Sequence, residues 1–313
     1  MPTAVSLFTG CGGSDMGLVR AGFDVVLSND ILPYAKDVHE ANFPNSNFVL
    51  GDVAKITEFP DAELLVGCYP CQGFSQGGSR DPSKKINFLY REFDRALRAI
   101  RPKAFIVENV SGMTRADFAH LLNNQIIRYR LAGYRVSWQK LKAVEYGVAQ
   151  ERTRLFIVGI RSDFETTFEF PEPTHGTDRL FEQLVQQDVL QGMPEWPEGD
   201  FDAQPFHWYY LSRDRYRDWN EPSKTIVSNS RHMPLYPGSP KLVKIGDDEW
   251  QFEESNLRPR RLSYLEAARL QGFDANFVLP DTARLARKYE VIGNAVPPPL
   301  FEAVAGALPN IWD

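Results

Sequence analysis

The sequence has few of the features that stabilise secreted proteins or anchor proteins in membranes. Its 313 residues include three cysteines, Cys11, Cys68 and Cys71, which are too few for a disulfide framework. Cys68 and Cys71 have the spacing of half a zinc site, but no second cysteine or histidine pair completes it, so we expect no metal. No run of about 18 apolar residues could span a bilayer, and residues 1–5 lack the regions of a signal peptide. We therefore expect a cytoplasmic protein that contacts no membrane.

An excess of positive charge is also missing, because 35 basic and 41 acidic residues give a net charge of −6. The acidic residues are concentrated, however: residues 162–202 hold eleven of them and one basic residue, Arg179. That segment carries −10, so the other 272 residues sum to +4. A polyanion could bind the remainder of the chain if the acidic segment faces away from it. The net charge therefore excludes no class of partner.

Short apolar runs alternate with helical patterns in the first half of the chain. In residues 90–100, for example, Phe93, Leu97 and Ile100 lie on one helical face. A second helix is expected at residues 16–21. Strands are expected at residues 5–8, 24–30, 64–67, 104–107 and 155–160. Strands that alternate with helices predict right-handed crossovers and an α/β fold with a doubly wound, mostly parallel sheet.

The pattern changes after residue 161. Nine prolines fall between Pro171 and Pro240 without a strong hydrophobic period, which indicates a second region of irregular or short-strand structure. A regular signal returns at residues 261–270, where Ser263 and Glu266 have the spacing of a helix capping box.

A glycine-rich turn follows the first expected strand. Glycines at a strand-to-helix turn let the backbone approach a ligand at the positive end of the helix. Asp30, at the end of the second expected strand, suits a carboxylate that accepts hydrogen bonds from ribose hydroxyls. Asp15 occupies the position of a further glycine in the dinucleotide fingerprint, so a simple tight turn stays an alternative. Asp52 offers another carboxylate before the next strand, where a turn is again the alternative. The turn holds Phe8, Gly10, Gly12 and Gly13.

The loop after residues 64–67 contains Cys71 among proline and glycine residues. A cysteine in such a loop is accessible enough to act as a nucleophile, although most unpaired cysteines are small hydrophobic residues in turns.

Glu108 ends an apolar strand, where it could act as a proton donor; a helix cap by Asn109 or Ser111 is the alternative. Arg152 and Arg154 alternate at the entry to a strand and could share a face that holds an anion; surface charge is the alternative.

Together and in this order, six motifs resemble those of the DNA (cytosine-5)-methyltransferases. The resemblance spans residues 5–300, and its unmatched part, 171–255, is where that family has its variable target-recognition region. Two positions depart from the family pattern: Tyr69 replaces a proline and Ser6 replaces an aspartate. The motifs are Phe8-x-Gly10-x-Gly12-Gly13, Pro70-Cys71-Gln72, Glu108-Asn109-Val110, Gln150-x-Arg152-x-Arg154, Arg261–Phe273 and Ile292–Pro298.

The resemblance implies a role for each matching residue in a Rossmann-like, S-adenosylmethionine-dependent domain. The Cys71 thiolate would add to carbon 6 of a flipped-out cytosine, while Glu108 contacts nitrogen 3 and Arg152 and Arg154 hold the O2 side. Gln72 and Ser75 would fill or brace the gap left in double-stranded DNA. The cofactor would bind at Phe8, Gly10, Gly12, Gly13, Asp30, Ile31, Asp52, Val53, Leu89 and Asn294.

The resemblance also implies a division of the chain. Residues 1–160 plus 275–313 would form the catalytic and cofactor-binding domain, residues 165–262 the target-recognition domain, and residues 263–274 a hinge helix.

A nicotinamide-dependent enzyme would explain the glycine turn and Asp30, but not Cys71 followed by Glu108 and the paired arginines. A tRNA methyltransferase of the same fold is the stronger alternative. That branch typically carries a Cys-Phe-Thr element, and no cysteine follows Cys71 here.

Basic residues outnumber acidic ones by five to three between residues 207 and 231. The guanidinium fork matches the O6 and N7 acceptors of guanine, so this stretch is expected to read DNA bases; phosphate contacts are the alternative. It resembles the region of enzymes that modify GGCC, which predicts a short G·C-rich palindrome. A cognate restriction endonuclease, acting independently, is a further expectation, as is association with the nucleoid. The candidate residues are Arg213, Arg215, Arg217, Arg231 and Thr225, the last as a support for the target-strand backbone.

Overall fold

The structure is a computed structural model that describes residues 1–70 and 88–312. These residues fall into two compact units. The first, called the sheet unit, comprises Met1–Lys142, Thr153–Glu172 and Pro298–Asp313. The second, called the loop-rich unit, comprises Ala143–Arg152 and Pro173–Pro297. In the described parts of both units, no helix has the length and apolar character needed to cross a membrane.

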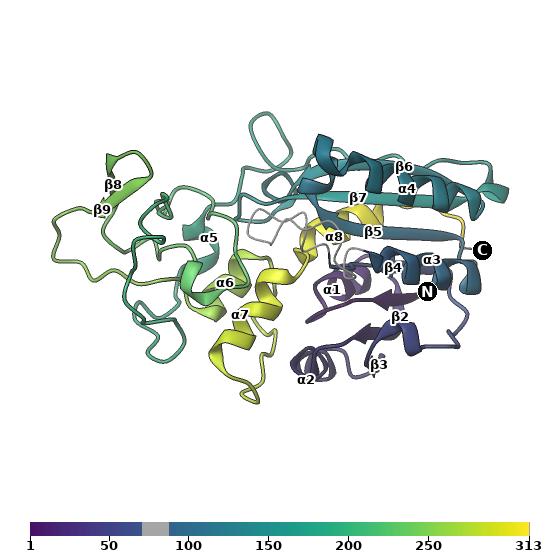
Figure 1. Cartoon of the computed structure of the whole chain (residues 1–313), viewed down its shortest axis with the longest axis horizontal. Coiled ribbons are helices and arrows are strands. Elements are labelled where there is room, and N and C mark those ends of the chain that lie inside the picture. Colours follow the sequence, from purple (N-terminus) through teal and green to yellow (C-terminus); the bar gives the residue numbers. More distant parts are fainter. Residues whose placement is uncertain (71–87, 313) are drawn as a thin grey trace. The chain divides into compact units, whose positions relative to one another are not determined.

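A seven-stranded sheet forms the centre of the sheet unit, with strand order β3-β2-β1-β4-β5-β7-β6 (Figure 1). The five strands from β3 to β5 are parallel, and β7 runs antiparallel to both β5 and β6. The fold prediction is therefore confirmed: the sheet is mostly parallel and doubly wound. The strands are β1 (Thr3–Leu7), β2 (Asp24–Asp30), β3 (Asn47–Leu50), β4 (Leu64–Gly67), β5 (Ala104–Val110), β6 (Tyr134–Lys142) and β7 (Thr153–Arg161).

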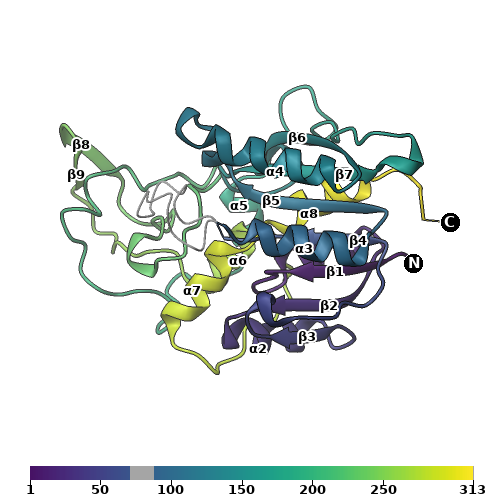
Figure 2. The same cartoon turned by 45° about the vertical axis from the view of Figure 1, so that its right-hand side comes forward.

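Helices cover both faces of this sheet. Phe93 of α3 (Tyr90–Ile100) and Tyr129 of α4 (Ala119–Leu131) pack on Phe105 in one buried cluster, and Figure 2 shows both helices on one face of the strands. Phe156, which faces the other way from its neighbours on β7, contacts Phe301 of α8 (Pro298–Gly306). The remaining helices of the unit are α1 (Gly13–Arg20), which packs on α8, and α2 (Pro33–Asn42).

The order of the strands brings the candidate turns together. The chain leaves β1 toward β2 and β3 and returns to β4 on the other side of β1, so the carboxyl ends of β1 and β4 flank a topological switch point. Backbone pairing continues past both ends: Cys68 N–H donates to Leu7 O at 3.1 Å, and Thr9 N–H donates to Asn29 O at 3.0 Å. In open α/β sheets ligands bind at such a point.

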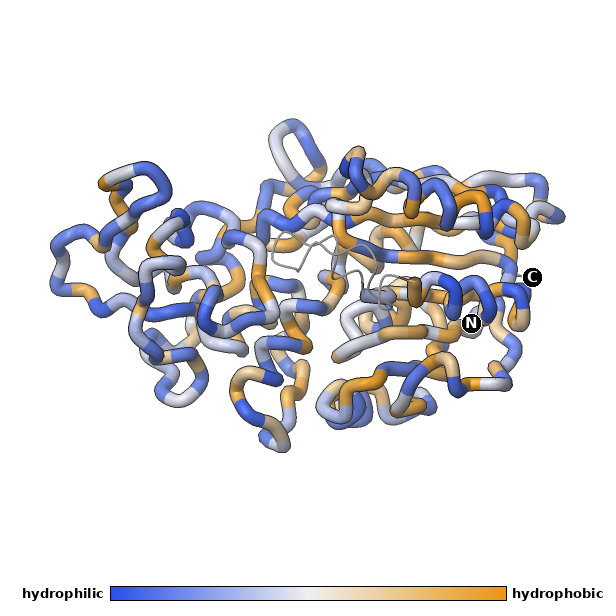
Figure 3. Tube along the Cα trace, in the orientation of Figure 1, coloured by the Kyte–Doolittle hydropathy of each residue, from blue (hydrophilic) through white to orange (hydrophobic). Residues whose placement is uncertain are grey.

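The loop-rich unit contains little regular structure, as its prolines predict. The small cluster of Tyr210, Leu235 and Leu242 is buried, and α6 begins with the predicted capping box between Ser263 and Glu266. In Figure 3 the apolar colouring of this unit is scattered, whereas it follows the strands of the sheet unit. The elements are α5 (Gln186–Leu190), β8 (Leu242–Gly246), β9 (Glu249–Phe252), α6 (Tyr264–Leu270) and α7 (Leu285–Asn294).

Two buried arginines hold this unit together. The Arg260 guanidinium makes two 2.7 Å bonds to the Glu266 carboxylate and lies 3.5 Å from the centre of the Tyr236 ring. Arg261 donates to the backbone oxygens of Asp202 and Gln204. Both side chains are almost fully buried. Arg260 also donates to Glu195 O at 2.8 Å, so each arginine links segments that are far apart in the sequence.

The functional division predicted from the sequence stays a prediction, because compactness alone does not define function. Outside the expected hinge helix, the two divisions differ at three stretches. Residues 143–152 and 275–297 were expected in the catalytic domain but belong to the loop-rich unit, and residues 165–172 were expected in the target-recognition domain but belong to the sheet unit.

Candidate active site

The predicted glycine turn is built from left-handed backbone. Phe8, Gly10 and Gly12 have φ angles of 60°, 57° and 86°, and α1 begins immediately afterwards at Gly13. A side chain on Gly12 would place its Cβ 2.4 Å from the ring of Phe43. Position 12 therefore needs glycine both for its conformation and for space. The Phe8 and Tyr69 rings are nearly perpendicular, with 6.0 Å between their centres.

Asp30 closes this turn from the neighbouring strand. Its carboxylate accepts the Gly10 N–H and the Leu32 N–H, each at 2.9 Å. Burial raises the pKa of Asp30 above its ordinary value, although both hydrogen bonds act to lower it. Ile31, directly after it, is 64% exposed and presents an apolar side chain at the surface beside Asp30. Two of the residues expected at a cofactor thus lie side by side at the end of β2.

A buried polar network beneath the turn was missed by sequence reasoning. The Asp15 carboxylate accepts hydrogen bonds from Ser6 Oγ at 2.5 Å and Ser28 Oγ at 2.7 Å, and lies 2.9 Å from His39 Nε2. Burial alone would raise the pKa of Asp15, but these partners lower it below its ordinary value. The available signals were Asp15, which stands where the dinucleotide fingerprint has a glycine, and Ser6, which stands where the family pattern has an aspartate.

Asp52 and Val53 lie in the next turn along the sheet edge. Asp52 caps a short 3-10 helix, Val53–Lys55, by accepting the Ala54 N–H at 3.0 Å. Arg95 of α3 donates to Val53 O at 2.8 Å and fixes this turn from below. Val53 is buried, and a hollow of about 330 Å³ runs past Asp52. Leu89 is half-buried at the start of α3.

Glu108 and Arg154 meet on adjacent strands. Arg154 Nε lies 2.9 Å from Glu108 Oε1, and both side chains are mostly buried. Burial lowers the pKa of Arg154, and the Glu108 carboxylate partly offsets that effect. A buried carboxylate needs such a partner to remain charged. The two residues, 46 positions apart, were predicted separately, and the sheet brings them into contact.

The strand end that leads toward Cys71 is firmly held. Asn109 Nδ2 donates to Tyr69 O at 3.1 Å, and the Tyr69 hydroxyl bonds with Gln125 and Tyr129 of α4. Asn109 therefore ties β5 to the end of β4. The 3-10 helix at Ser111–Thr114 has no side-chain cap, so the alternative of a helix cap does not hold there. Cys71, Gln72 and Ser75 lie outside the described residues.

The other two cysteines are unsuited to nucleophilic chemistry. Burial raises the pKa of the Cys11 thiol far above its ordinary value. Burial, followed by the charge of the nearby Glu108, does the same to the pKa of Cys68. Both thiols are therefore protonated at neutral pH, and the thiolate is the reactive form. No cluster of metal-binding side chains occurs in residues 1–70 and 88–312.

Arg152 makes structural contacts in the loop-rich unit. Its guanidinium donates to the backbone oxygens of Ile226, Gly293 and Ala295 at 2.9–3.0 Å. Arg154 instead contacts a carboxylate, so the expected pair of arginines makes two different kinds of contact. A catalytic role for Arg152 stays a prediction.

Two glutamines extend this structural role and were also missed. Gln150 Oε1 accepts the Ile226 N–H at 2.9 Å, and its amide group donates to the side chain of Gln271. Gln271 in turn donates to Ala295 O at 2.6 Å. Both glutamines stand in the quoted motifs, which was the available signal. Asn294, expected at the cofactor, is exposed at the end of α7, where Gly293 packs against the backbone of Val227.

The five DNA-binding residues expected between residues 207 and 231 fall into two groups. Arg215 is turned inward and donates to Tyr210 O and His232 O, while Arg217 forms ion pairs with Asp214 and Glu151. The second group is exposed: Arg213 lies over the Tyr209 ring, Thr225 bonds to Glu151 O, and Arg231 follows the cap made by Asn229.

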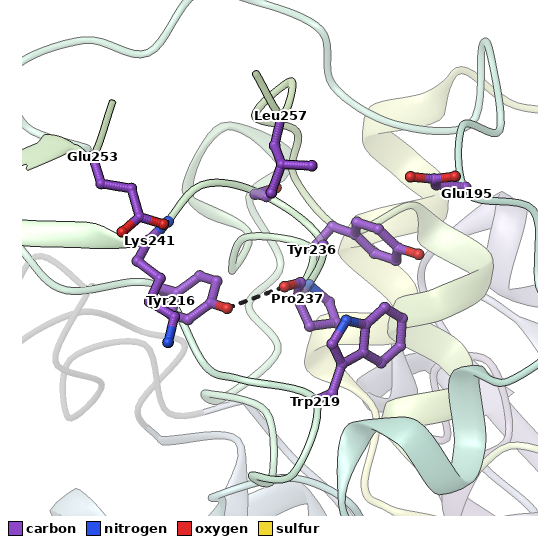
Figure 4. A pocket seen from close by; sticks show the side chains of 10 residues that line it. Glu195, Tyr216, Trp219, Tyr236, Pro237, Lys241, Glu253 and Leu257 are labelled. Carbon is purple, nitrogen blue, oxygen red and sulfur yellow. Dashed lines mark hydrogen bonds between the residues drawn. The ribbon is translucent and has the colours of Figure 1, made fainter. Parts of the chain in front are cut away.

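The loop-rich unit also carries an aromatic hollow of about 480 Å³ (Figure 4). The rings of Tyr216, Trp219 and Tyr236 line it, and the Tyr216 hydroxyl donates to Pro237 O at 3.2 Å. Lys241 at its rim forms an ion pair with Asp218 at 3.3 Å. The contacts of Tyr216 and Lys241 are thus made within the unit itself.

Comparison with known proteins agrees with this arrangement of motifs. The family model for C-5 cytosine-specific DNA methylases matches residues 3–310. The chain belongs to this family. It is a DNA (cytosine-5)-methyltransferase of the restriction–modification type.

Two curated relatives are Type II methyltransferases. M.BspRI of Lysinibacillus sphaericus is 33% identical, with 97% of this chain and 80% of the relative covered. M.BsuRI of Bacillus subtilis is 34% identical, with 98% and 79% covered. Among solved structures, the Dnmt2 methyltransferase of S. pombe superimposes with a TM-score of 0.70 over 98% of this chain and 97% of its own, at 18% identity. That likeness shows the fold alone.

Proposed function

We propose that this methyltransferase transfers a methyl group from S-adenosylmethionine to carbon 5 of a cytosine rotated out of double-stranded DNA, through a covalent adduct with Cys71. The observation that carries the proposal is the buried Glu108–Arg154 pair. It lies beside the strand end that Asn109 ties down and that leads directly into Pro70 and Cys71. An acid, a guanidinium and a cysteine are the groups that cytosine C5 chemistry needs.

The glycine turn and Asp30 suit the proposed methyl donor. Gly10 has open space where a Cβ would stand, so a ligand could approach its backbone. Asp30 can accept hydrogen bonds from ribose hydroxyls, and the exposed Ile31 and half-buried Phe8 offer apolar surfaces to an adenine ring. When bound, the donor supplies an electrophilic methyl group. Asp52, Val53, Leu89, Gly12, Gly13 and Asn294 would complete the site.

The chemistry follows from the low nucleophilicity of cytosine carbon 5. When the Cys71 thiolate forms a bond to carbon 6, electron density moves to carbon 5. Carbon 5 can then attack the methyl group, whose bond to the donor's sulfur breaks, so that the donor leaves as the neutral thioether S-adenosylhomocysteine. Protonated Glu108 donates a hydrogen bond to nitrogen 3, and Arg154 stabilises the negative charge that develops on the ring. Loss of the carbon 5 proton to a base then restores the double bond as the carbon 6–sulfur bond breaks. Arg152 would support this arrangement.

The target atom is inaccessible in a stacked duplex, so the base must leave the helix at a cost of a few kcal/mol. Gln72 and Ser75 would fill or brace the vacated space.

For the target sequence we propose a short G·C-rich palindrome, with GGCC as the specific candidate. Of the three alternate arginines, the exposed Arg213 is better placed to read a base than Arg215 or Arg217, whose guanidinium groups bond within the unit. A cognate endonuclease would cut the same sequence when it is unmethylated.

Bisulfite sequencing of a plasmid that carries the gene tests the activity and the sequence together. We expect methylcytosine at one G·C-rich palindrome. Total tRNA from the same cells is sequenced in parallel, because methylation confined to tRNA would contradict the proposal. An A·T-rich target would contradict its sequence preference.

Trapping with a duplex that contains 5-fluorocytosine tests the covalent step, since fluorine cannot leave as the proton does. The wild type should form an adduct that survives denaturation, and Cys71→Ser should not. Cys68→Ser is the matched control, because Cys68 has a raised pKa and should not contribute. An adduct formed by Cys71→Ser would refute the assignment.

A further inference from the structure

Asp15 carries a charge that the methyl-transfer chemistry described above does not use. It lies in the first turn of α1, where an aspartate is ordinarily exposed and favours the positive end of the helix, but here it is fully buried. Its Oδ1 accepts hydrogen bonds from Ser6 and Ser14. Its Oδ2 accepts one from Ser28 and lies 2.9 Å from His39 Nε2. A buried charge is costly unless it is bonded in this way, so its partners are held in a defined geometry.

The carboxylate joins the start of α1 to the two strands that lead into the expected donor site. Ser6 Oγ donates to it at 2.5 Å, from the position before the last residue of β1. Ser28 Oγ donates to it at 2.7 Å, two residues before Asp30 at the end of β2. The glycine turn begins after β1 and ends at α1, so Asp15 sets the spacing between the two ends of the turn.

His39 connects the same carboxylate to α2. The Asp15 carboxylate is ionised at neutral pH, so His39 Nε2 is the donor. The centre of the His39 ring lies 4.7 Å from that of Phe43, directly after α2. The Phe43 ring occupies the space that a Cβ on Gly12 would need. His39 therefore links Asp15 to the left-handed part of the turn by way of Phe43.

The conformation of the turn depends on such support. Phe8 has a φ angle of 60°, which is uncommon for a bulky residue and persists only where the surrounding structure imposes it. The Gly10 N–H donates to the Asp30 carboxylate at 2.9 Å, so the turn and Asp30 are also in direct contact. A shift of α1 or α2 would change both the turn and its distance from Asp30.

We propose that Asp15 and His39 are positioning residues for S-adenosylmethionine, which hold the glycine turn and the Asp30 carboxylate in the arrangement that binds the donor. This inference rests on the proposed donor site. Both side chains have no exposed surface, so they act through the turn rather than by contact with the donor. Their loss should weaken donor binding and leave the chemistry at the cytosine unchanged.

Isothermal calorimetry with S-adenosylmethionine tests the aspartate. Asp15→Ala leaves buried donors without an acceptor and should raise the Kd about ten-fold. In steady-state kinetics the KM for the donor should rise by a similar factor, while kcat at saturating donor and the KM for DNA stay within about two-fold. Such a split means that binding common to the ground state and the transition state was lost.

Two variants of His39 test the hydrogen bond separately from the packing. His39→Gln retains an N–H donor and should raise the donor Kd about three-fold or less. His39→Leu keeps apolar contact with Phe43 but cannot donate, and should raise the Kd about ten-fold. The double variant Asp15→Ala, His39→Leu should bind the donor no more weakly than either single variant, because both remove the same bond.

Asp94→Ala is the matched control for a general loss of stability. Asp94 is a buried aspartate of α3 in the same unit, and it accepts hydrogen bonds from Arg98 and Arg128. Its removal should lower the unfolding temperature and leave the Kd for S-adenosylmethionine unchanged. Hydrogen exchange of the donor-free protein adds a readout that needs no activity. Exchange in peptides that cover residues 8–13 should be faster in Asp15→Ala and His39→Leu, and unchanged in Asp94→Ala.

The outcomes separate this proposal from the proposed function. If the wild type methylates cytosine in DNA but Asp15→Ala and His39→Leu bind the donor as the wild type does, the positioning role is wrong. Equal weakening by Asp94→Ala, or by His39→Gln and His39→Leu alike, would also overturn it. If the variants weaken donor binding as expected but the wild type methylates no cytosine in DNA, the positioning role stands and the proposed function fails. Should Asp15→Ala not fold, the comparison of the two His39 variants decides.

Discussion

Each of the two units of this methyltransferase is stabilised internally by a different kind of interaction. In the sheet unit, alternating apolar side chains on β1, β4, β5 and β7 pack under helices, and the cluster around Phe93 and Phe105 is fully buried. In the loop-rich unit, buried guanidinium groups bond to carboxylates and backbone oxygens, as Arg260 and Arg261 do. Apolar packing produces a sequence period that can be recognised, whereas a network of buried arginines does not. A unit with little regular structure can still adopt one defined fold if its buried charges are paired.

The largest expected effect concerns the buried ion pair of the loop-rich unit. Glu266→Ala should lower the free energy of unfolding by about 3–5 kcal/mol, because Arg260 would remain buried without its carboxylate. Urea unfolding followed by tryptophan fluorescence measures it, since four of the six tryptophans (Trp196, Trp208, Trp219 and Trp250) lie in this unit.

Glu290→Ala is the matched control for that variant. Its partner Arg287 is exposed on the same α7 surface, so the loss should stay below about 1 kcal/mol. Equal effects of the two glutamate variants would mean that buried charges do not hold the loop-rich unit together.

A smaller effect is expected where the sheet unit depends on close packing. Gly17→Ala should cost about 1–3 kcal/mol of stability, because its Cβ would lie 2.8 Å from the backbone nitrogen of Glu302 in α8. Gly306→Ala, at the end of α8, meets open space and should change stability by less than about 1 kcal/mol. Thermal unfolding of both variants gives the comparison, and a harmless Gly17→Ala would contradict the tight contact between α1 and α8.

The smallest expected effect is on binding rather than on stability. Asp30→Asn should raise the Kd for S-adenosylmethionine about ten-fold, equivalent to about 1.4 kcal/mol for one charge-assisted hydrogen bond, with DNA affinity unchanged. Isothermal calorimetry measures both quantities, and an unchanged Kd for the donor would remove Asp30 from the proposed site.

The pH dependence gives a second readout of Asp30. Burial raises its pKa. In the proposed donor site, the ionised form would accept hydrogen bonds from the ribose hydroxyls. Donor affinity should therefore be constant near neutral pH and fall as the pH drops through that raised pKa, beginning above the ordinary aspartate range. Asp30→Asn should lack this fall. A wild-type affinity that is flat with pH down to the ordinary range would contradict the role.

Much of the sheet unit was predictable because its physical rules are local. The predicted strands at 24–30 and 64–67 and the helix at 90–100 match the structure, since apolar runs and helical periods depend on neighbours in the chain. Strand β6 was not foreseen, because its central side chains are partly exposed and give no apolar run. The contacts of Arg152 with distant carbonyls, and the inward turn of Arg215, gave no local signal either.

By itself the sequence determined which chemical groups are present, in which order, and which segments form strands and helices. It placed a cysteine after one strand, a glutamate at the end of another and an arginine at the entry to a third, and the alternation of strands with helices predicted the fold of the sheet. Only the tertiary structure decided that Glu108 meets Arg154 and that the Asp15 carboxylate is buried against His39. It also decided which arginines bond within the loop-rich unit and which stay exposed. The reason is that side-chain partners depend on which segments pack together, and these segments lie tens of residues apart in the chain.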